Sequence, residues 1–328
     1  MRHRCRAPSR DCIAGSEIRL AEKEENMRYF LENNILKAEI DSHGAELKSV
    51  LRKDTWREYM WYGNPKYWNR TSPVLFPTVG NLKGKRFILN GKEYPMGQHG
   101  FARDMEFEPE SELRDENGFV SEIWFKLDSS EETIAKYPYA FRLHLGYRLE
   151  EDRLKVLWRV DNPAGELLYF SIGAHPAFLV PVYGESSKTG YYLSFDAGEE
   201  LHHYGNKTEL GLATPEEDLI LPLENGRVRI TEDFFDRCTY MFAGRQTGRV
   251  SIEDPRQKPI VTLEFDTPIF AIWSPEKKNA PFICIEPWYG RCDASNYDGD
   301  FIHREYTQKL EPGQSFEAGY SIRYHRIG

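Results

Sequence analysis

The sequence LHLGYRLEEDRLKVLWRV, residues 143–160, contains two runs in which every second residue is apolar. The apolar residues of the two runs are Leu143, Leu145, Tyr147, Leu149, Leu154, Val156, Trp158 and Val160. A period of two places such residues on one face of a β-strand. The acidic residues 150–152 separate the runs, so the stretch predicts a β-hairpin with one buried face.

The same kind of pattern recurs along the chain from Met27 onward. Phe87–Tyr94 contains Asn90-Gly91, a strong tight-turn signal, between short apolar flanks. Further strand-like segments are 250–252, 260–265 and the final alternating run 316–324. These segments predict an all-β chain built from many antiparallel strands, as a sandwich or a barrel.

Helical signal is scarce. Residues 131–136 favour a single turn before Tyr137-Pro138, and no longer segment repeats with a period of 3.6 residues. No internal repeat or low-complexity linker divides the chain. We therefore expect one domain over residues 27–328, with few short helices.

The first 26 residues differ from the rest. They are charged, lack aromatic residues and show no β-type alternation. They also lack the apolar central stretch of a secretory signal. We expect residues 1–26 to be an N-terminal extension that is disordered or loosely attached.

The composition excludes several classes of protein. The chain has 328 residues, 40% hydrophobic and 29% charged, with a net charge of −9. This acidic balance argues against a nucleic-acid partner. The sequence has no run of about 18 apolar residues, so we expect no membrane-spanning helix. The five cysteines form no C-x-x-C pair, which predicts reduced thiols in a cytoplasmic protein. They are Cys5, Cys12, Cys238, Cys284 and Cys292.

Four segments interrupt the alternation with unusual polar residues. They are RTSPVLFPTVG (70–80), HGFAR (99–103), GAHPAF (173–178) and CIEPWYG (284–290). His99 and His175 stand beside Gly or Pro, where a side chain can project into a cleft or serve a structural role. Glu286 ends an apolar run, where a carboxylate is costly to bury unless it is paired or used. Arg70 is either a surface ion-pair partner or a fork of donors for ligand oxygens.

Other sites are disfavoured by spacing. Two histidines and a carboxylate can hold zinc, but the sequence has no H-x-H or H-E-x-x-H, so we predict no metal site. No phosphate-binding loop, nucleotide fingerprint or G-x-S-x-G motif is present.

The four segments, in this order, resemble the aldose 1-epimerase family, and in particular its bacterial LacX-like branch. The resemblance runs from about Met27 to the C-terminus. It implies a large antiparallel β-sandwich of the galactose mutarotase type, with an open sugar site and no metal or organic cofactor. By the same resemblance, His175 matches the general acid and Glu286 the general base. Arg70, His99 and, more loosely, Asp236 in FFDRC match sugar-binding positions.

The implied activity is interconversion of the α and β anomers of a hexose. The high aromatic content, 14%, suits a β-rich core and also a pocket for sugar rings. The expected partner is a small-molecule sugar, and both a monomer and a homodimer stay open.

Three alternatives stay open beside this interpretation. A hexose-phosphate 1-epimerase would need extra cations at the pocket, for which Arg103, Arg245 and Arg291 are candidates. A non-catalytic carbohydrate-binding or sensor protein would use the same residues without turnover. A glycosidase or lyase would usually need two facing acidic residues, and only Glu286 stands in a motif.

Overall fold

The hairpin predicted from residues 143–160 lies within the larger sheet of the protein. The computed structural model describes residues 27–207 and 211–328, so the predicted extension lies outside the described residues. β10 (Arg142–Glu150) and β11 (Arg153–Asp161) pair antiparallel, with Leu145 opposite Trp158. All eight alternating apolar side chains are buried. The period-two pattern therefore identified the core face of this hairpin correctly.

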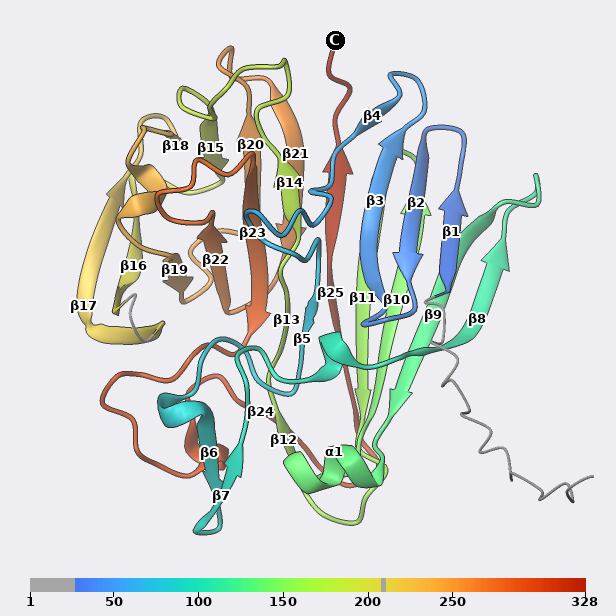
Figure 1. Ribbon diagram of the computed structural model, residues 1–328, viewed down its shortest axis with the longest axis vertical. Coiled ribbons are helices and arrows are strands. Elements are labelled where there is room, and N and C mark those ends of the chain that lie inside the picture. Colours follow the sequence, from blue (N-terminus) through green and yellow to red (C-terminus); the bar gives the residue numbers. More distant parts are fainter. Residues whose placement is uncertain (1–26, 208–210) are drawn as a thin grey trace, which may run out of the picture.

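The larger sheet has nine antiparallel strands (Figure 1). In spatial order they are β18 (Arg227–Arg229), β15 (Tyr192–Phe195), β20 (Arg249–Glu253), β21 (Pro259–Phe265), β25 (Ser315–Tyr324), β11, β10, β9 (Val120–Asp128) and β8 (Glu108–Arg114). The segments 250–252, 260–265 and 316–324 all fall within these strands, as predicted.

A second sheet of eight strands carries the motif segments. Its order is β17 (Leu212–Pro222), β16 (Glu200–Lys207), β19 (Tyr240–Ala243), β22 (Ile269–Trp273), β23 (Phe282–Tyr289), β13 (Ile172–Ala174) and β5 (Val74–Leu75), with β14 (Ala177–Leu179) also paired to β23. The strands that carry or flank Arg70, His175 and Glu286 are therefore neighbours in space, although their sequences are far apart.

Smaller sheets complete the molecule. A four-stranded sheet is formed by β1 (Arg28–Glu32), β2 (Leu36–Asp41), β3 (Glu46–Arg52) and β4 (Arg57–Glu58). Two ribbons are formed by β6 (Arg86–Leu89) with β7 (Lys92–Pro95), and by β12 (Leu168–Phe170) with β24 (Gln308–Leu310). The β6–β7 ribbon is the hairpin predicted from Asn90-Gly91, and Asn90 has the positive φ of 51° that such a turn requires.

Helices are few and short in the described residues. They are α1 (Glu131–Lys136) and the 3₁₀ helices η1 (Lys83–Lys85), η2 (Ala102–Asp104), η3 (Phe234–Asp236) and η4 (Phe301–His303). The single turn predicted at residues 131–136 is α1. It begins at a capping box, in which the Ser130 hydroxyl accepts from the Thr133 N–H and the Thr133 hydroxyl accepts from the Ser130 N–H.

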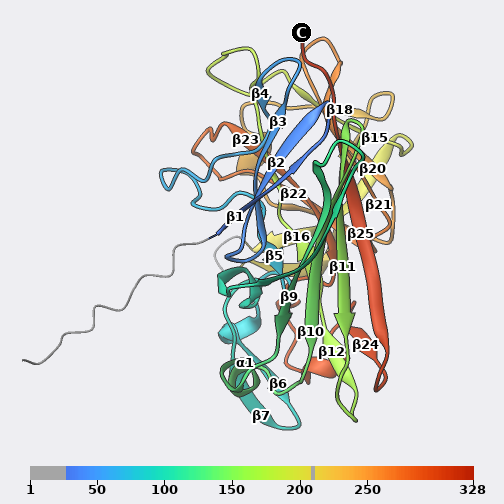
Figure 2. The ribbon, with the colours of Figure 1, turned by 90° about the vertical axis from the view of Figure 1, so that its right-hand side faces the viewer.

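The sheets pack face to face around an aromatic core. Figure 2 shows β9, β10, β11 and β25 of the nine-stranded sheet side by side, and β1–β3 belong to a separate sheet. Trp158 of β11 meets Tyr289 of β23 with ring centroids 6.4 Å apart, and Tyr29 of β1 packs against Phe125 of β9 at 5.1 Å. About 49% of the described residues are in strands and 6% in helices. The predicted all-β sandwich is thus confirmed.

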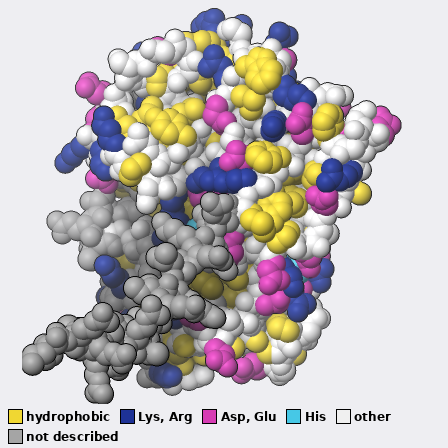
Figure 3. All heavy atoms as spheres, turned by 45° about the vertical axis from the view of Figure 1, so that its right-hand side comes forward, with side chains coloured by type: hydrophobic (Ala, Val, Ile, Leu, Met, Phe, Trp, Pro, Cys, Tyr) yellow, Lys and Arg dark blue, Asp and Glu magenta, His cyan; other side chains and the backbone are white. Residues whose placement is uncertain are grey.

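The surface agrees with the charge argument. On the face shown in Figure 3, Lys and Arg side chains are interspersed with Asp and Glu. A face that tracks the phosphates of a nucleic acid would instead carry clustered cations. Within the described part of the chain, no helix is long and apolar enough to cross a membrane.

Candidate active site

One cavity of about 260 Å³ gathers three of the residues selected from the sequence, His99, His175 and Glu286. Larger cavities of about 430 to 460 Å³ occur elsewhere in the described residues, but no histidine that lines them forms an ion pair with a carboxylate, as His175 does with Glu286. The cavity is therefore selected as the candidate site by its His175–Glu286 pair and not by its volume.

His175 lies in the break between two short strands. β13 and β14 both pair with β23, and His175-Pro176 joins them. Proline has no N–H to donate, so the ladder is interrupted at this point. The His175 N–H donates instead to the carbonyl of Pro73 at 3.2 Å. The break leaves the imidazole at the cavity wall, where the residue is 7% exposed.

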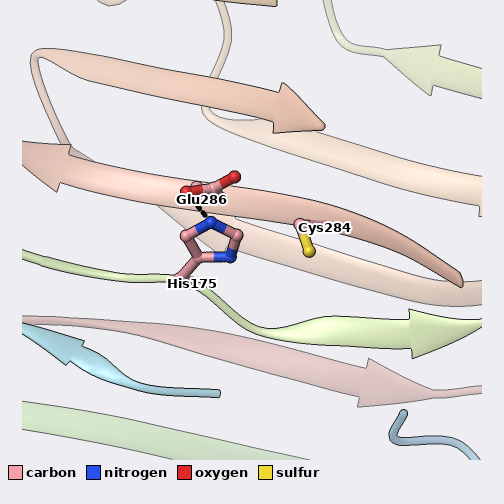
Figure 4. Close-up of side chains that lie close together, drawn as sticks. All are labelled: His175, Cys284 and Glu286. Atoms are coloured by element: carbon pink, nitrogen blue, oxygen red, sulfur yellow. Dashed lines mark ion pairs between the residues drawn. The ribbon is translucent and has the colours of Figure 1, made fainter. Parts of the chain in front are cut away.

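Glu286 is held within β23, opposite Ala271 of β22, and is only 1% exposed. Its Oε2 atom lies 3.2 Å from Nε2 of His175, as the dashed line in Figure 4 marks. Among the described residues, neither this oxygen nor Nδ1 of His175 has a hydrogen-bond partner. Buried polar atoms are nearly always satisfied, so these two atoms are free to take hydrogen-bond partners from a ligand or from water.

Burial controls the charge of this pair. Loss of water raises the pKa of the Glu286 carboxyl well above its ordinary value. Burial, followed by the nearby charge of Arg103, lowers the pKa of His175 to about 3. Both shifts favour the uncharged forms of two groups whose Nε2 and Oε2 atoms are 3.2 Å apart.

His99 contributes a neutral imidazole of fixed orientation. It has a positive φ of 65°, and its Nδ1 accepts a hydrogen bond of 3.0 Å from the N–H of Gly80. Burial, with the neighbouring His175 and Arg103, lowers the pKa of His99 well below its ordinary value. Since Nδ1 is an acceptor, the ring proton of the neutral form is on Nε2. That N–H is suited to donate to a ligand oxygen.

The two arginines near the cavity have different surroundings. Arg70 is paired with Asp104 at 2.6 Å and is not a lining residue. Arg103 does line the cavity, and its Nε is buried without an acceptor in the described residues. Burial and the charge of Arg70 lower the pKa of Arg103 to about 10. Both arginines lie close enough to lower the pKa values of His99 and His175.

Glu46 fixes the segment that follows Arg70. Its carboxylate accepts hydrogen bonds from the backbone N–H groups of Thr71 and Ser72, at 2.6 and 2.9 Å. Glu46 is far from this segment in sequence and has no motif around it, so the sequence analysis did not select it.

Asp236 is not brought to this cavity. It lies in η3, accepts a hydrogen bond of 2.6 Å from the N–H of Lys277, and lines a separate cavity of about 430 Å³. Of the other candidate cations, Arg245 pairs with Asp266, and Arg291 pairs with Glu305 at 2.5 Å beside another cavity. Only Arg103 of that group lines the cavity that holds His175.

Three tryptophans line the cavity, and the sequence analysis assigned none of them to the site. They are Trp68, Trp273 and Trp288. The ring of Trp68 lies 4.6 Å from that of His175 at 31°, and Trp273 meets the same imidazole edge-on at 5.4 Å. Trp68 and Trp288 stand in or beside the motifs and could have been selected. Trp273 has no local signal, because only the pairing of β22 with β23 places it there.

Comparison with known proteins identifies the family of this chain. The family model described as aldose 1-epimerase matches residues 27–323. The chain belongs to the aldose 1-epimerase family. It is 29% identical over 302 residues to the plasmid-encoded protein LacX of Lactococcus lactis subsp. lactis, covering 89% of this chain and 97% of LacX.

Solved structures of the same type are similar along most of the chain. A galactose mutarotase related enzyme from Lactobacillus acidophilus has a TM-score of 0.84 and 33% identity, over 92% of this chain and 98% of that one. A galactose mutarotase-like protein from Lactobacillus casei has a TM-score of 0.83 and 30% identity, over 91% and 100% of the two chains. Family membership confirms the resemblance found in the four motifs and supports a role as a sugar epimerase or mutarotase.

Proposed function

We propose that this protein is an aldose 1-epimerase that interconverts the α and β anomers of a hexose by acid–base ring opening. The single observation that carries this proposal is the buried contact of 3.2 Å between His175 and Glu286, in a cavity lined by tryptophans. Ring opening needs one proton removed from the anomeric hydroxyl and one delivered to the ring oxygen. A pair that holds a single shared proton meets both needs.

The direction of proton transfer follows from solvation. Burial by itself favours the uncharged state, in which Glu286 is protonated and His175 is neutral. Hydroxyl groups of a bound sugar would hydrogen-bond both side chains and stabilise the charged state, an imidazolium beside a carboxylate. Glu286 then takes the proton of the anomeric hydroxyl and His175 protonates the ring oxygen. Closure on the other face of the aldehyde reverses these steps.

The remaining residues have binding roles in this proposal. His99 donates its Nε2–H to a sugar oxygen, and Arg103 offers its unpaired Nε–H. Arg70 does not line the cavity, and its proposed role is to add positive charge next to Arg103. The faces of Trp68 and Trp273 suit the C–H faces of a pyranose ring. No role is proposed for Asp236, because it lines a different cavity.

The test is anomeric equilibration followed by polarimetry, with freshly dissolved α-glucose and α-galactose. Wild-type protein should accelerate mutarotation of at least one sugar. Glu286→Gln and His175→Asn should each lower turnover roughly 100-fold or more, the usual contribution of a positioned acid or base. Near-wild-type turnover in either variant would overturn the assignment.

Arg103 favours a second candidate, a hexose-phosphate 1-epimerase. The partly buried Arg103 guanidinium lies next to the positive charge of Arg70, and its Nε makes no hydrogen bond within the described residues, so it is suited to a phosphate or another anionic substituent. This version predicts faster turnover of phosphorylated hexoses, inhibition by free phosphate, and loss of that preference in Arg103→Gln. If neither neutral nor phosphorylated hexoses turn over but both bind, a carbohydrate-binding protein is the better description.

A further inference from the structure

A third side chain completes a cluster around the acid–base pair. Cys284 lies two residues before Glu286 in β23, so both side chains point to the same face of the strand. Nitrogen, sulfur and oxygen atoms of His175, Cys284 and Glu286 all lie within 4.8 Å of one another, and all three residues are buried. Figure 4 shows the imidazole between the carboxylate and the thiol.

We propose that His175, Cys284 and Glu286 bind one thiophilic divalent cation, such as Zn²⁺ or Cd²⁺, and that this metal inhibits the enzyme. The inhibition rests on the proposed function, whereas the binding does not. The metal would not be a cofactor. It would occupy the two groups that ring opening needs and would remove both from the reaction.

The geometry is close to that of a tetrahedral site. Zinc bonds of about 2.0 Å to nitrogen or oxygen and about 2.3 Å to sulfur place ligand atoms roughly 3.3–3.8 Å apart. The contact between His175 and Glu286 is already 3.2 Å. The other atoms lie within 4.8 Å, so a shift of about 1 Å would complete three ligands. The fourth position would face the cavity, where water or a sugar hydroxyl can enter.

One further observation points to a ligand at this place. Oε2 of Glu286 is buried without a hydrogen-bond partner in the described residues. Metal binding would release the proton of the Cys284 thiol, because the thiolate is the form that binds a metal.

The test uses full-length protein in which Cys5 and Cys12 are replaced by Ser, because these two thiols lie outside the described residues. Cd²⁺ is titrated into this metal-free protein, and the cadmium–thiolate charge-transfer absorption in the ultraviolet is recorded. The proposal predicts one strong site per chain, and competition by Zn²⁺. It also predicts loss of mutarotase activity in parallel with the absorption.

Matched thiol variants identify the ligand. Cys284→Ser should abolish the absorption at this site and weaken binding at least roughly 100-fold, more than the loss of an outer-shell partner usually costs. Cys238→Ser and Cys292→Ser also replace buried thiols and should keep the wild-type spectrum. Cys284→Ala replaces the same thiol with an apolar side chain and serves as a second variant. Near-ultraviolet circular dichroism reports whether each variant is folded.

The outcomes separate the two proposals. Absorption that survives in folded Cys284→Ser, or that disappears in Cys292→Ser, would overturn the metal site. So would the absence of cadmium–thiolate absorption in the parent protein. If the absorption appears as predicted but no sugar is turned over, the metal site stands and the proposed function fails. If activity is present and the metal binds without inhibition, the metal lies elsewhere and the proposal is overturned.

Discussion

At the scale of single residues, burial decides the chemistry of His175 and Glu286. The motifs identify both residues, and the family resemblance describes them as an imidazolium acid and a carboxylate base. The structure adds that both side chains are desolvated, which favours their uncharged forms. The charged and uncharged states of the pair hold the same number of protons. The pair can therefore rest uncharged and react charged, without exchanging a proton with water.

Burial of Glu286 has a cost in stability that can be measured. Its folded pKa lies well above its ordinary value of 4.5. Folding therefore favours the protonated carboxyl. The contribution of this proton to the unfolding free energy is fully present below about pH 4.5, and it is lost as the pH rises through the folded pKa. Glu286→Gln removes this loss. We expect the variant to gain unfolding free energy, relative to wild type, as the pH rises from about 4.5 toward the folded pKa of Glu286.

Urea unfolding of both proteins at pH 5, 6 and 7 would measure this gain. Glu116→Gln, at an exposed position, serves as the control and should show no such trend. A difference between Glu286→Gln and wild type that stays constant across this pH range would contradict the raised pKa.

At the scale of elements, the site depends on a tight turn next to β5. His99 and Gly100 both have positive φ, at 65° and 72°, and the Gly100 Cα lies against the carbonyl group of Phe76. A Cβ at this glycine would stand 2.2 Å from the Phe76 oxygen. The sequence HGFAR predicts a turn here, but the close contact with Phe76 is visible only in the fold.

Gly100→Ala should therefore destabilise the protein by at least about 2 kcal/mol, since both the positive φ and the backbone contact oppose a side chain. Gly97→Ala is the matched control. It lies three residues away, and a Cβ there meets nothing within 4 Å. Its effect should stay within about 1 kcal/mol. Chemical denaturation measures the unfolding free energy of both variants. Equal losses of unfolding free energy in the two would contradict the importance of this contact.

At the scale of the whole molecule, local patterns predicted the fold well and the site in part. The strands of the 143–160 hairpin, the Asn90-Gly91 turn and helix α1 follow from period, turn chemistry and capping, which are all local. His99, His175 and Glu286 stand in motifs and share one cavity. Trp273 and Glu46 could not be selected, because strand pairing and long-range hydrogen bonds place them. The prediction for Asp236 depended on a loosely matching motif. The structure places Asp236 in η3, beside another cavity.

The proposed domain boundary at Met27 also belongs to this scale. The backbone N–H of Ser42 donates to the Met27 carbonyl at 2.9 Å, so Met27 is itself held in the described fold. Removal of residues 1–26 should leave the melting temperature and turnover unchanged. Differential scanning calorimetry and the anomer assay on residues 27–328 would measure both. A clear loss of either would show that the domain includes the extension.

The most direct test of the central claim is a double-mutant cycle on the acid–base pair. One-dimensional proton NMR of freshly dissolved α-glucose and α-galactose gives the anomeric equilibration rate for wild type, His175→Asn, Glu286→Gln and the double variant. If both residues act in one proton-transfer step, each single change should cost roughly 100-fold or more, and the double change should cost little beyond the larger single loss. Wild-type rates in a single variant, or single losses that multiply in the double variant, would contradict the central claim.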